Sequence, residues 1–389
     1  MPYSLYFHIP FCTHRCAYCD FNTYAGQERL IPAYVEALCN EIRSVAARAP
    51  ERLSVHTIFF GGGTPSLLTP VQFEQILQTV RNRFDLVNQP DLETCLEANP
   101  GTVSPDYLRE LREVGFNRIS YGVQSANPQE LRMLERIHSY SDVVNAVTWS
   151  RRAGFDNLNL DLIYGLPEQT LESWQHTLQL VSGLHPEHIS AYALTLEHGT
   201  PFGRWAAKGL LPIPDPDLAA EQYEWCMQFL SEQGHQQYEI SNWSLPGHQC
   251  QHNLQYWRNL DYLGLGAGAH GYAGGYRYSN VLRIKTYIDR CAGGPADLPF
   301  PLSPATVNQH RNTPRDDMQE TMLTGLRLTS EGISSRVFAA RFGARPQDVF
   351  GPEIEKMLNF GLLEWAGDTL RLTVRGRLLG NQVFMQFVG

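Results

Sequence analysis

The chain has 389 residues, 43% of them hydrophobic, which is enough for one large domain together with a smaller one. Its formal net charge of -9 weighs against nucleic acid as the main partner. The sequence shows neither a secretory signal nor an apolar run long enough to span a membrane. Five of the eight cysteines are scattered without ligand spacing, namely Cys39, Cys95, Cys226, Cys250 and Cys291. Such cysteines predict reduced thiols and a cytoplasmic location.

Short apolar runs alternate with amphipathic stretches over the first two-thirds of the chain. We expect strands at residues 5–9, 57–60, 94–98, 118–123, 157–163 and 188–194. Helices are expected between them, at residues 32–49, 70–84, 105–114, 142–153 and 171–182, several of which open with proline or an acidic residue. This alternation predicts an α/β fold with a parallel sheet, and its six units favour a partial (β/α)6 barrel.

The last third of the chain has a looser pattern. Residues 201–216 are rich in glycine and proline and predict a surface segment, followed by a helix at 219–232 and a strand at 237–240. A polar linker is expected at 293–314, followed by helices at 316–324, 334–342 and 352–360 and a hairpin whose strands are 362–365 and 370–373. We therefore expect a core at 1–240, a connecting segment at 241–300 and a smaller, winged-helix-like helical domain with a β-hairpin at 301–389.

Three cysteines near the N-terminus, Cys12, Cys16 and Cys19, have the spacing Cys-x3-Cys-x2-Cys. A [4Fe-4S] cluster has four irons, each of which needs a terminal ligand, so three thiolates leave one iron open to a substrate or cofactor. Zinc prefers four ligands, and His14 lies between the cysteines, where tetrahedral closure would be strained. A disulfide cannot use three cysteines. The motif therefore predicts a reactive, open-iron cluster.

Polar residues and glycines gather where the predicted strands end. Residues 61–65 read Gly-Gly-Gly-Thr-Pro, and Glu97, Gln124 and Asp161 lie at the ends of later strands. In a parallel barrel these ends meet at one edge, where the chemistry collects. The glycines would let backbone amides approach a ligand, and the carboxylates can accept hydrogen bonds from ribose hydroxyls or make structural hydrogen bonds at the rim. Arg136 can hold a carboxylate bidentately.

The cysteine spacing is the hallmark of the radical SAM superfamily. Together with the strand ends, it resembles the oxygen-independent coproporphyrinogen III oxidase family from residue 4 to about residue 272, and the C-terminal unit resembles that family's second domain. The resemblance implies a [4Fe-4S] cluster on Cys12, Cys16 and Cys19 that binds S-adenosylmethionine (SAM) and cleaves it reductively. It implies SAM contacts by two sets of residues: Tyr6, Gly62 and Glu97 for the cluster-bound molecule, and Gly63, Thr64, Gln124, Arg136 and Asp161 for a second one.

Two features depart from the decarboxylating enzyme. That enzyme has a further cysteine two residues after the third, where this chain has Phe21, and it has an N-terminal extension, whereas the first expected strand here begins almost at Met1. In addition, residues 250–257 read Cys-Gln-His-Asn-Leu-Gln-Tyr-Trp, which is similar to the His-Asn-x-x-Tyr-Trp motif of the HemW-type heme chaperones. In a helix His252 and Tyr256 would share a face. The resemblance implies that His252 ligates heme, with Cys250 as an alternative ligand, although such a histidine can also be a packed core residue.

Two functions follow from these resemblances. The favoured one is a heme chaperone that transfers heme to apo-hemoproteins such as respiratory enzymes, with the cluster and SAM regulating or driving the transfer. An electron donor and membrane association through partners are implied, and no catalytic residue is assigned. The alternative is radical decarboxylation of coproporphyrinogen III to protoporphyrinogen IX, which Phe21 disfavours. A cluster protein with an unrelated radical substrate is a third interpretation.

Overall fold

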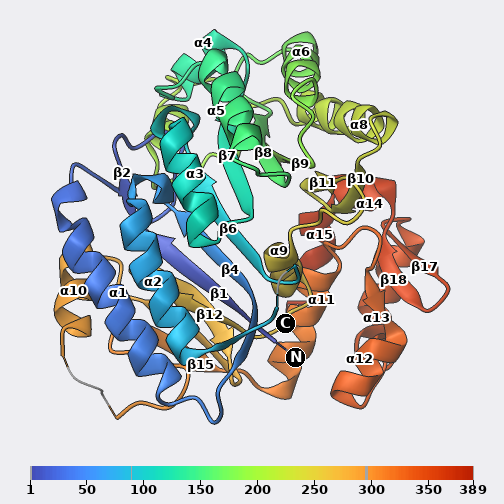
Figure 1. Ribbon diagram of the computed structural model, residues 1–389. Helices are drawn as coiled ribbons and strands as arrows, with labels where there is room; N and C mark the ends of the chain where they lie inside the picture. Colours follow the sequence, from blue (N-terminus) through green and yellow to red (C-terminus); the bar gives the residue numbers. More distant parts are fainter. Residues whose placement is uncertain (1, 89, 294–296, 389) are drawn as a thin grey trace.

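The computed structural model describes residues 2–88, 90–293 and 297–388 (Figure 1). Its central sheet contains six neighbouring parallel strands in the order β9-β8-β7-β6-β4-β1. Their bounds are β1 (Tyr3–Ile9), β4 (Ser54–Gly62), β6 (Glu93–Ala98), β7 (Arg118–Gln124), β8 (Leu158–Tyr164) and β9 (His188–Ala193). All six predicted strands are confirmed, and so is the parallel α/β architecture.

Helices cover the outer face of this sheet, and Figure 1 shows α1, α2, α3 and α5 side by side in front of it. Thr69 and Gln72 form a capping box at the start of α2, and Pro70 occupies its first turn, which explains why the helix begins there. Four fully buried aromatic rings, Phe7, Phe60, Phe73 and Phe116, interlock between helices and sheet. The helices are α1 (Ile31–Ala46), α2 (Pro70–Arg83), α3 (Pro105–Val114), α4 (Pro128–Met133), α5 (Tyr140–Arg152) and α6 (Leu171–Ser182).

The sheet continues beyond the six parallel strands at both edges. Next to β1 lie β12 (Tyr262–Leu265), which is parallel to it, and then the antiparallel strands β13 (His270–Ala273), β14 (Tyr276–Asn280) and β15 (Thr306–Arg311). At the other edge, β10 (Gln236–Glu239) and β11 (Asn242–Ser244) follow β9. The predicted linker at 293–314 is therefore wrong where β15 lies, and its residues 294–296 fall outside the described part. The polar sequence of β15 concealed it because an exposed edge strand has little apolar alternation.

The segment after β9 is only partly a surface excursion. It contains α7 (Pro201–Ala207) and the start of α8 (Pro216–Glu232). Phe202 is buried, and its backbone N–H donates to the carbonyl oxygen of Ala17 in the cysteine loop at 3.1 Å. The expectation of a purely surface segment is wrong here, because α7 helps to hold that loop. The remaining short elements of the core are β2 (Phe11–Cys12), β3 (Tyr24–Ala25), β5 (Asp85–Leu86), α9 (Gln251–Trp257), α10 (Ile284–Cys291) and the 3-10 helices η1 (Glu28–Leu30), η2 (Pro65–Leu67) and η3 (Pro100–Thr102).

The C-terminal unit has its own hydrophobic core, which includes Met322, Phe338, Phe350 and Leu370. Its small antiparallel sheet has the order β16-β18-β17, and the β17–β18 pair is the predicted hairpin. The succession of helices followed by this hairpin confirms the winged-helix-like prediction, and two short helices follow the hairpin. Its elements are α11 (Pro314–Gly325), β16 (Ile333–Ser334), α12 (Ser335–Phe342), α13 (Pro346–Asn359), β17 (Leu363–Ala366), β18 (Thr369–Leu372), α14 (Val374–Leu378) and α15 (Gly380–Phe384).

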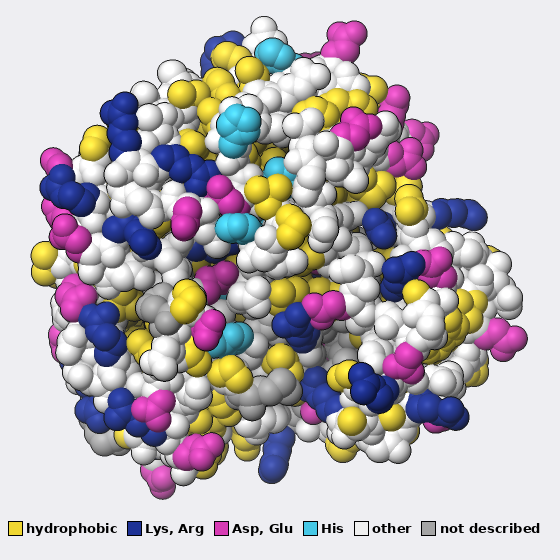
Figure 2. Space-filling model, turned by 45° about the vertical axis from the view of Figure 1, so that its right-hand side comes forward, with side chains coloured by type: hydrophobic (Ala, Val, Ile, Leu, Met, Phe, Trp, Pro, Cys, Tyr) yellow, Lys and Arg dark blue, Asp and Glu magenta, His cyan; other side chains and the backbone are white. Residues whose placement is uncertain are grey.

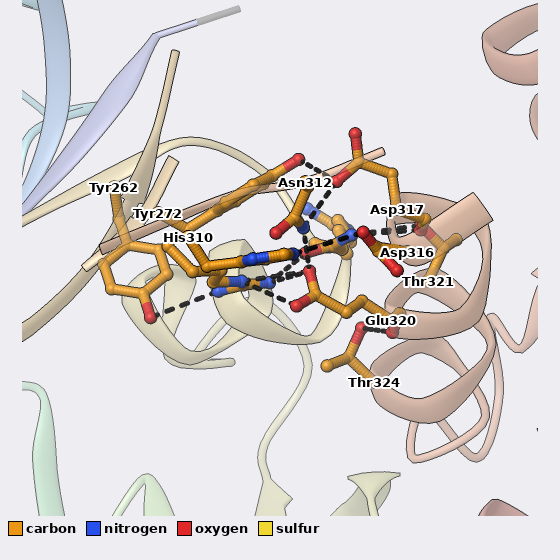
Figure 3. Close-up of polar contacts among 12 residues, drawn as sticks. Tyr262, Tyr272, His310, Asn312, Asp316, Asp317, Glu320, Thr321 and Thr324 are labelled. Atoms are coloured by element: carbon orange, nitrogen blue, oxygen red, sulfur yellow. Dashed lines mark hydrogen bonds and ion pairs between the residues drawn. The ribbon is translucent and has the colours of Figure 1, made fainter. Parts of the chain in front are cut away.

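A polar junction ties α11 to the β12–β15 side of the sheet. Figure 3 shows the side chain of Tyr272 beside the acidic residues of α11 and that of Tyr262 at the opposite end of the network. Arg277 on β14 pairs with Glu320 at 2.7 Å, and its guanidinium lies 3.9 Å from the centre of the Tyr272 ring. It also donates to the hydroxyl oxygen of Tyr262 at 3.4 Å. The junction thus links the C-terminal unit directly to β12, next to β1.

Basic and acidic side chains are intermingled on the surface face shown in Figure 2. No helix in the described ranges is both long and apolar enough to cross a membrane. No disulfide joins any two of the eight cysteines.

Candidate functional site

The cysteine loop leaves the carboxyl end of β1 and is held by neighbouring strand ends. Cys12 lies in β2, and a tight turn brings the N–H of Cys19 to 3.2 Å from the carbonyl oxygen of Cys16. The Thr64 hydroxyl, after β4, donates to the Cys12 sulfur at 3.5 Å, and Arg136 donates to the Cys16 sulfur at 3.7 Å. Polar groups from two other segments therefore already contact two of the three thiols.

The three thiols fit a cluster better than a single ion. Within the described ranges, no three His, Cys, Asp or Glu side chains converge closely enough to hold one metal ion. A [4Fe-4S] cluster presents a different iron to each thiolate and does not need such convergence. Burial raises the pKa of the Cys12 and Cys19 thiols, so iron binding must displace their protons. His14, the only alternative ligand inside the loop, pairs with Glu135 at 3.3 Å.

A cavity of about 480 Å³ opens over this loop, a volume within the range of small-molecule sites. All three cysteines line it. So do most of the residues that were predicted to surround SAM: Gly62, Gly63, Thr64, Glu97, Gln124, Arg136 and Asp161. The structure thus brings together residues from five strand ends or the loops after them. Tyr6 is the exception, because its side chain lines a different cavity.

Glu97 and Asp161 are hydrogen-bond acceptors in the wall of this first cavity. The Gly62 N–H donates to Glu97 at 3.0 Å, and the Ser120 hydroxyl donates to Asp161 at 2.7 Å. Burial, followed by the negative charge of Asp161, raises the pKa of Glu97 to about 7, although the Gly62 bond opposes the shift. Burial also raises the pKa of Asp161. A ligand that donates hydrogen bonds or carries positive charge would stabilise both ionised forms.

The glycines at the end of β4 allow close packing. Gly62 has a φ of +110°, and a Cβ added there would lie 2.4 Å from the His8 ring; one at Gly63 would lie 2.6 Å from the Phe11 carbonyl oxygen. The N–H of Gly63 donates to the carbonyl oxygen of Ile9, and that of Thr64 to the carbonyl oxygen of Phe11. These amides therefore bond within the protein, whereas the sequence suggested that they approach a ligand.

Other residues of the first cavity were not singled out from the sequence. They include Ser120, Tyr192 and Glu197. Polar side chains at alternate positions of β8, Asn159 and Asp161, point to the interior of the barrel because strand side chains alternate between faces. The same alternation could have identified Ser120 on β7 as a lining residue. Glu197 lies in an irregular loop, where no such pattern exists.

His252 lies in α9 on the same face as Tyr256, as predicted, but deep in the core. It is 1% exposed and stacks on Phe59 with ring centres 5.0 Å apart. Because the Thr57 hydroxyl donates to Ser4, the His252 Nδ1–H donates to Thr57 at 2.7 Å, which leaves Nε2 to accept from the Tyr256 hydroxyl at 2.7 Å. Burial lowers the pKa of His252 to about 3, so the ring is neutral.

Neither nitrogen of His252 is therefore free for iron in this conformation, and heme ligation by His252 stays a prediction that requires the network to open. Cys250, the alternative ligand, is also buried. Its thiol donates to Glu93 at 3.6 Å, and it lines neither cavity. Glu93 in turn accepts from the N–H groups of Gln251 and His252 at the start of α9, which fixes the helix.

A second cavity, of about 720 Å³, lies on the other side of the cysteine loop and was not foreseen from the sequence. Arg15, Asp20 and Phe21 line both cavities, so the loop forms the wall between them. The rest of the second lining comes mainly from β1, α9, β12 and β13, and includes Tyr6, His8, Tyr24, Tyr256, Tyr262 and His270.

Comparison with known families agrees with this geometry. The Radical SAM superfamily matches residues 6–181, and the HemN C-terminal domain matches residues 312–379. The solved structure of coproporphyrinogen III oxidase (HemN) from Escherichia coli, a radical SAM enzyme, has a TM-score of 0.83 and 25% identity, covering 99% of this chain and 90% of its own. The fold and the cysteine site thus define a radical SAM protein with a HemN-type C-terminal domain, a class built around a [4Fe-4S] cluster and SAM.

The relatives by sequence are more specific. Heme chaperone HemW from Bacillus subtilis (strain 168) is 38% identical over 386 residues, which cover 99% of each chain. The protein of the same name from Escherichia coli (strain K12) is 36% identical over 389 residues, covering 100% of this chain and 98% of its own. The chain therefore belongs to the HemW family, which confirms the resemblance seen in its sequence.

Proposed function

We propose that this protein binds heme and transfers it to apo-hemoproteins, with respiratory enzymes among the recipients. The observation that carries the proposal is the end-to-end similarity, at 36–38% identity, to proteins named heme chaperone HemW from several organisms. The similarity spans the barrel, α9 and the C-terminal unit alike. A cavity of about 720 Å³ with an aromatic lining supports it from the geometry.

We propose that the first cavity is the SAM site of this chaperone. Cys12, Cys16 and Cys19 would hold the cluster, which when bound supplies an open iron and an electron for SAM chemistry. Glu97 and Asp161 offer acceptors for ribose hydroxyls or an amino group. The remaining lining residues would enclose the cofactor and keep out water: Gly62, Gly63, Thr64, Gln124 and Arg136. Tyr6 would contact SAM only from the far side of the loop.

The partners follow from this function. An electron donor would reduce the cluster, and SAM binding or cleavage would regulate or drive heme transfer. We propose a cytoplasmic location, with membrane association through partners, and no nucleic-acid partner, since basic and acidic groups are intermingled on the surface face in Figure 2. We also propose that residues 1–240, 241–300 and 301–389 act as the barrel core, the heme-motif segment and the C-terminal domain.

One observation favours a second function, decarboxylation of coproporphyrinogen III. The structure matches the HemN enzyme over 99% of this chain with a TM-score of 0.83. Against it stands Phe21, which occupies the position of the further cysteine in that enzyme. Phe21 is 63% exposed and lines both cavities, so this chain has an apolar ring where that enzyme has a thiol.

One sample tests both functions. The cluster is reconstituted anaerobically, and the protein is divided between a hemin titration and a coproporphyrinogen turnover assay with SAM and a reductant. We expect one hemin per chain, transfer of that hemin to apomyoglobin as a general acceptor, and no decarboxylation. Sustained formation of protoporphyrinogen together with failure to bind hemin would show that the protein is the decarboxylating enzyme and not a heme chaperone.

A further inference from the structure

The second cavity has the composition of a site for a flat aromatic ligand. Tyrosines from β1, β3, α9 and β12 line it, and so do the exposed Phe21 and Leu282. Its volume of about 720 Å³ lies in the range of cavities that enclose a whole small molecule. Aromatic walls offer large contact areas to a porphyrin without requiring a hydrogen bond at each atom.

Heme iron in proteins is held mostly by histidine, cysteine, methionine or tyrosine. No cysteine or methionine lines the second cavity, as far as the described residues show. Each of its tyrosine hydroxyls has a partner: Tyr6 is bonded to His8, Tyr24 to the Leu282 carbonyl oxygen, Tyr256 to His252 and Tyr262 to Arg277. Ligation by any of these tyrosines would therefore break an existing contact.

The cavity contains two histidines, and they differ sharply. His8 is buried, donates from Nε2 to the Asn22 carbonyl oxygen at 3.0 Å and accepts at Nδ1 from the Tyr6 hydroxyl at 3.0 Å. The side chain of His270 is exposed, and its ring makes no hydrogen bond or ion pair with any other described residue. His270 is thus the cavity histidine whose nitrogens are open to iron.

The backbone of His270 is held in place by a tight turn between β12 and β13. A Cβ added at Gly264 would lie 1.8 Å from the His270 carbonyl oxygen, so only glycine permits this approach. Gly266 and Gly268 in the same turn have φ values of +102° and +81°. A histidine on a strand that is fixed this closely presents its ring at a defined place in the cavity wall.

Two arginines at or near the second cavity could pair with the carboxylates of a porphyrin. Arg15 lines the cavity. Arg283 lies just before α10, near Tyr24. Burial raises the pKa of Tyr24, and the positive charges of Arg283 and Arg15 partly oppose that shift. Asp20 also lines the cavity and is the acidic group that a propionate would have to avoid. Guanidinium groups bind carboxylates strongly, often through two hydrogen bonds.

We propose that His270 is the axial ligand of heme bound in the second cavity, an inference that rests on the heme-binding function proposed above. His252 then has a different role. It holds the Tyr256 hydroxyl from behind the cavity wall, as a positioning residue, and the Thr57–Ser4 pair holds His252. The His-Asn-x-x-Tyr-Trp segment thereby shapes the heme site without supplying the iron ligand.

The test compares three histidine variants of the reconstituted full-length protein: His270→Ala, His252→Ala and His176→Ala, the last being an exposed control on α6. Each is titrated with hemin, and the ferric heme is examined by electron paramagnetic resonance with the cluster oxidised. We expect His270→Ala to lose the histidine-ligated signal and to bind hemin about tenfold or more weakly. Added imidazole should restore the signal. Cluster content reports whether each variant has folded.

The remaining outcomes separate the two claims. His252→Ala should bind hemin more weakly while keeping the histidine-ligated signal, and His176→Ala should match the wild type. A wild-type signal in His270→Ala, or loss of the signal in His252→Ala alone, would overturn the assignment of His270 and leave the chaperone function standing. Failure of the wild-type protein to bind hemin at all would overturn the proposed function itself.

Discussion

The two cavities on either side of the cysteine loop are lined by different chemical groups. The first gathers sulfur, carboxylate and guanidinium groups from the ends of parallel strands, and burial shifts the pKa values of several of them. Aromatic side chains make up about half of the residues that line the second, among them four tyrosines whose hydroxyls are all hydrogen-bonded, and one of its two imidazoles has no hydrogen bond to any described residue. The first suits a polar, charged cofactor, whose charges would change the protonation of the groups around it. The second suits a flat apolar ring.

The difference implies that the cavities can be damaged separately. Both cavities share the loop residues Arg15, Asp20, Phe21 and Thr23, but the thiols line only the first cavity and His270 only the second. Variants of one cavity should therefore leave the ligand of the other in place.

Removal of the cluster ligands should have the largest effect. Cys12→Ala, Cys16→Ala and Cys19→Ala should each abolish a stable [4Fe-4S] cluster, because two thiolates leave two irons without protein ligands. Iron and sulfide analysis after anaerobic reconstitution measures this. Cys39→Ala, a buried thiol on α1, is the control and should retain full cluster content. Hemin binding should survive in all four variants. Loss of hemin binding together with the cluster would show that the second cavity depends on the first.

Gly62→Ala should destabilise the first cavity strongly. The new Cβ would lie 2.4 Å from the His8 ring, and φ is +110°, so clash and backbone strain together should cost about 2–4 kcal/mol of unfolding free energy. Gly115→Ala is a matched control, because its φ is +118° but nothing lies within 4 Å of an added Cβ. Urea unfolding should show a clearly larger loss for Gly62→Ala; equal losses would mean that His8 moves aside freely.

Glu97→Gln should change the pH dependence of stability. The folded-state pKa is about 7, above the ordinary value of 4.5, so the folded chain retains a proton that the unfolded chain releases. Stability therefore falls as pH rises from about 4.5 through 7, and the full penalty applies above that. Without SAM, the variant should gain about 1–2 kcal/mol over wild type at pH 8 and little at pH 4. Glu224→Gln, at an exposed position on α8, is the matched control. A flat difference for Glu97→Gln would argue that its carboxylate is solvated.

Arg277→Gln should have a smaller effect, at the junction shown in Figure 3. It removes a partly buried ion pair with Glu320 and the donor to Tyr262, at a cost of about 1–2 kcal/mol. Hemin affinity should drop slightly, since Tyr262 lines the second cavity. Arg345→Gln, in an exposed pair with Asp348, is the control and should change neither measurement. Identical behaviour of the two variants would show that the junction contributes neither to stability nor to hemin affinity.

The first cavity was largely predictable and the second was not, for physical reasons. Cys12, Cys16, Cys19, Glu97 and Asp161 carry chemistry that is unusual at strand ends, and the parallel topology brings strand ends together. The second cavity depends on β12 and β13. β12 pairs with β1 through residues more than 250 positions apart, and β13 pairs with β12. Tyrosines and a histidine in such strands look like ordinary core residues in a sequence. The same ambiguity affected His252, which has the spacing of a ligand but the hydrogen bonds of a core residue.

The most direct measurement is a hemin titration of the reconstituted protein with and without saturating SAM. Separate cavities predict one hemin per chain in both conditions, with the SAM-bound protein still accepting hemin and the histidine-ligated signal unchanged. Displacement of SAM by hemin in equal amounts would show that both ligands use the first cavity. That result would contradict the division between a polar cofactor cavity and an aromatic heme cavity.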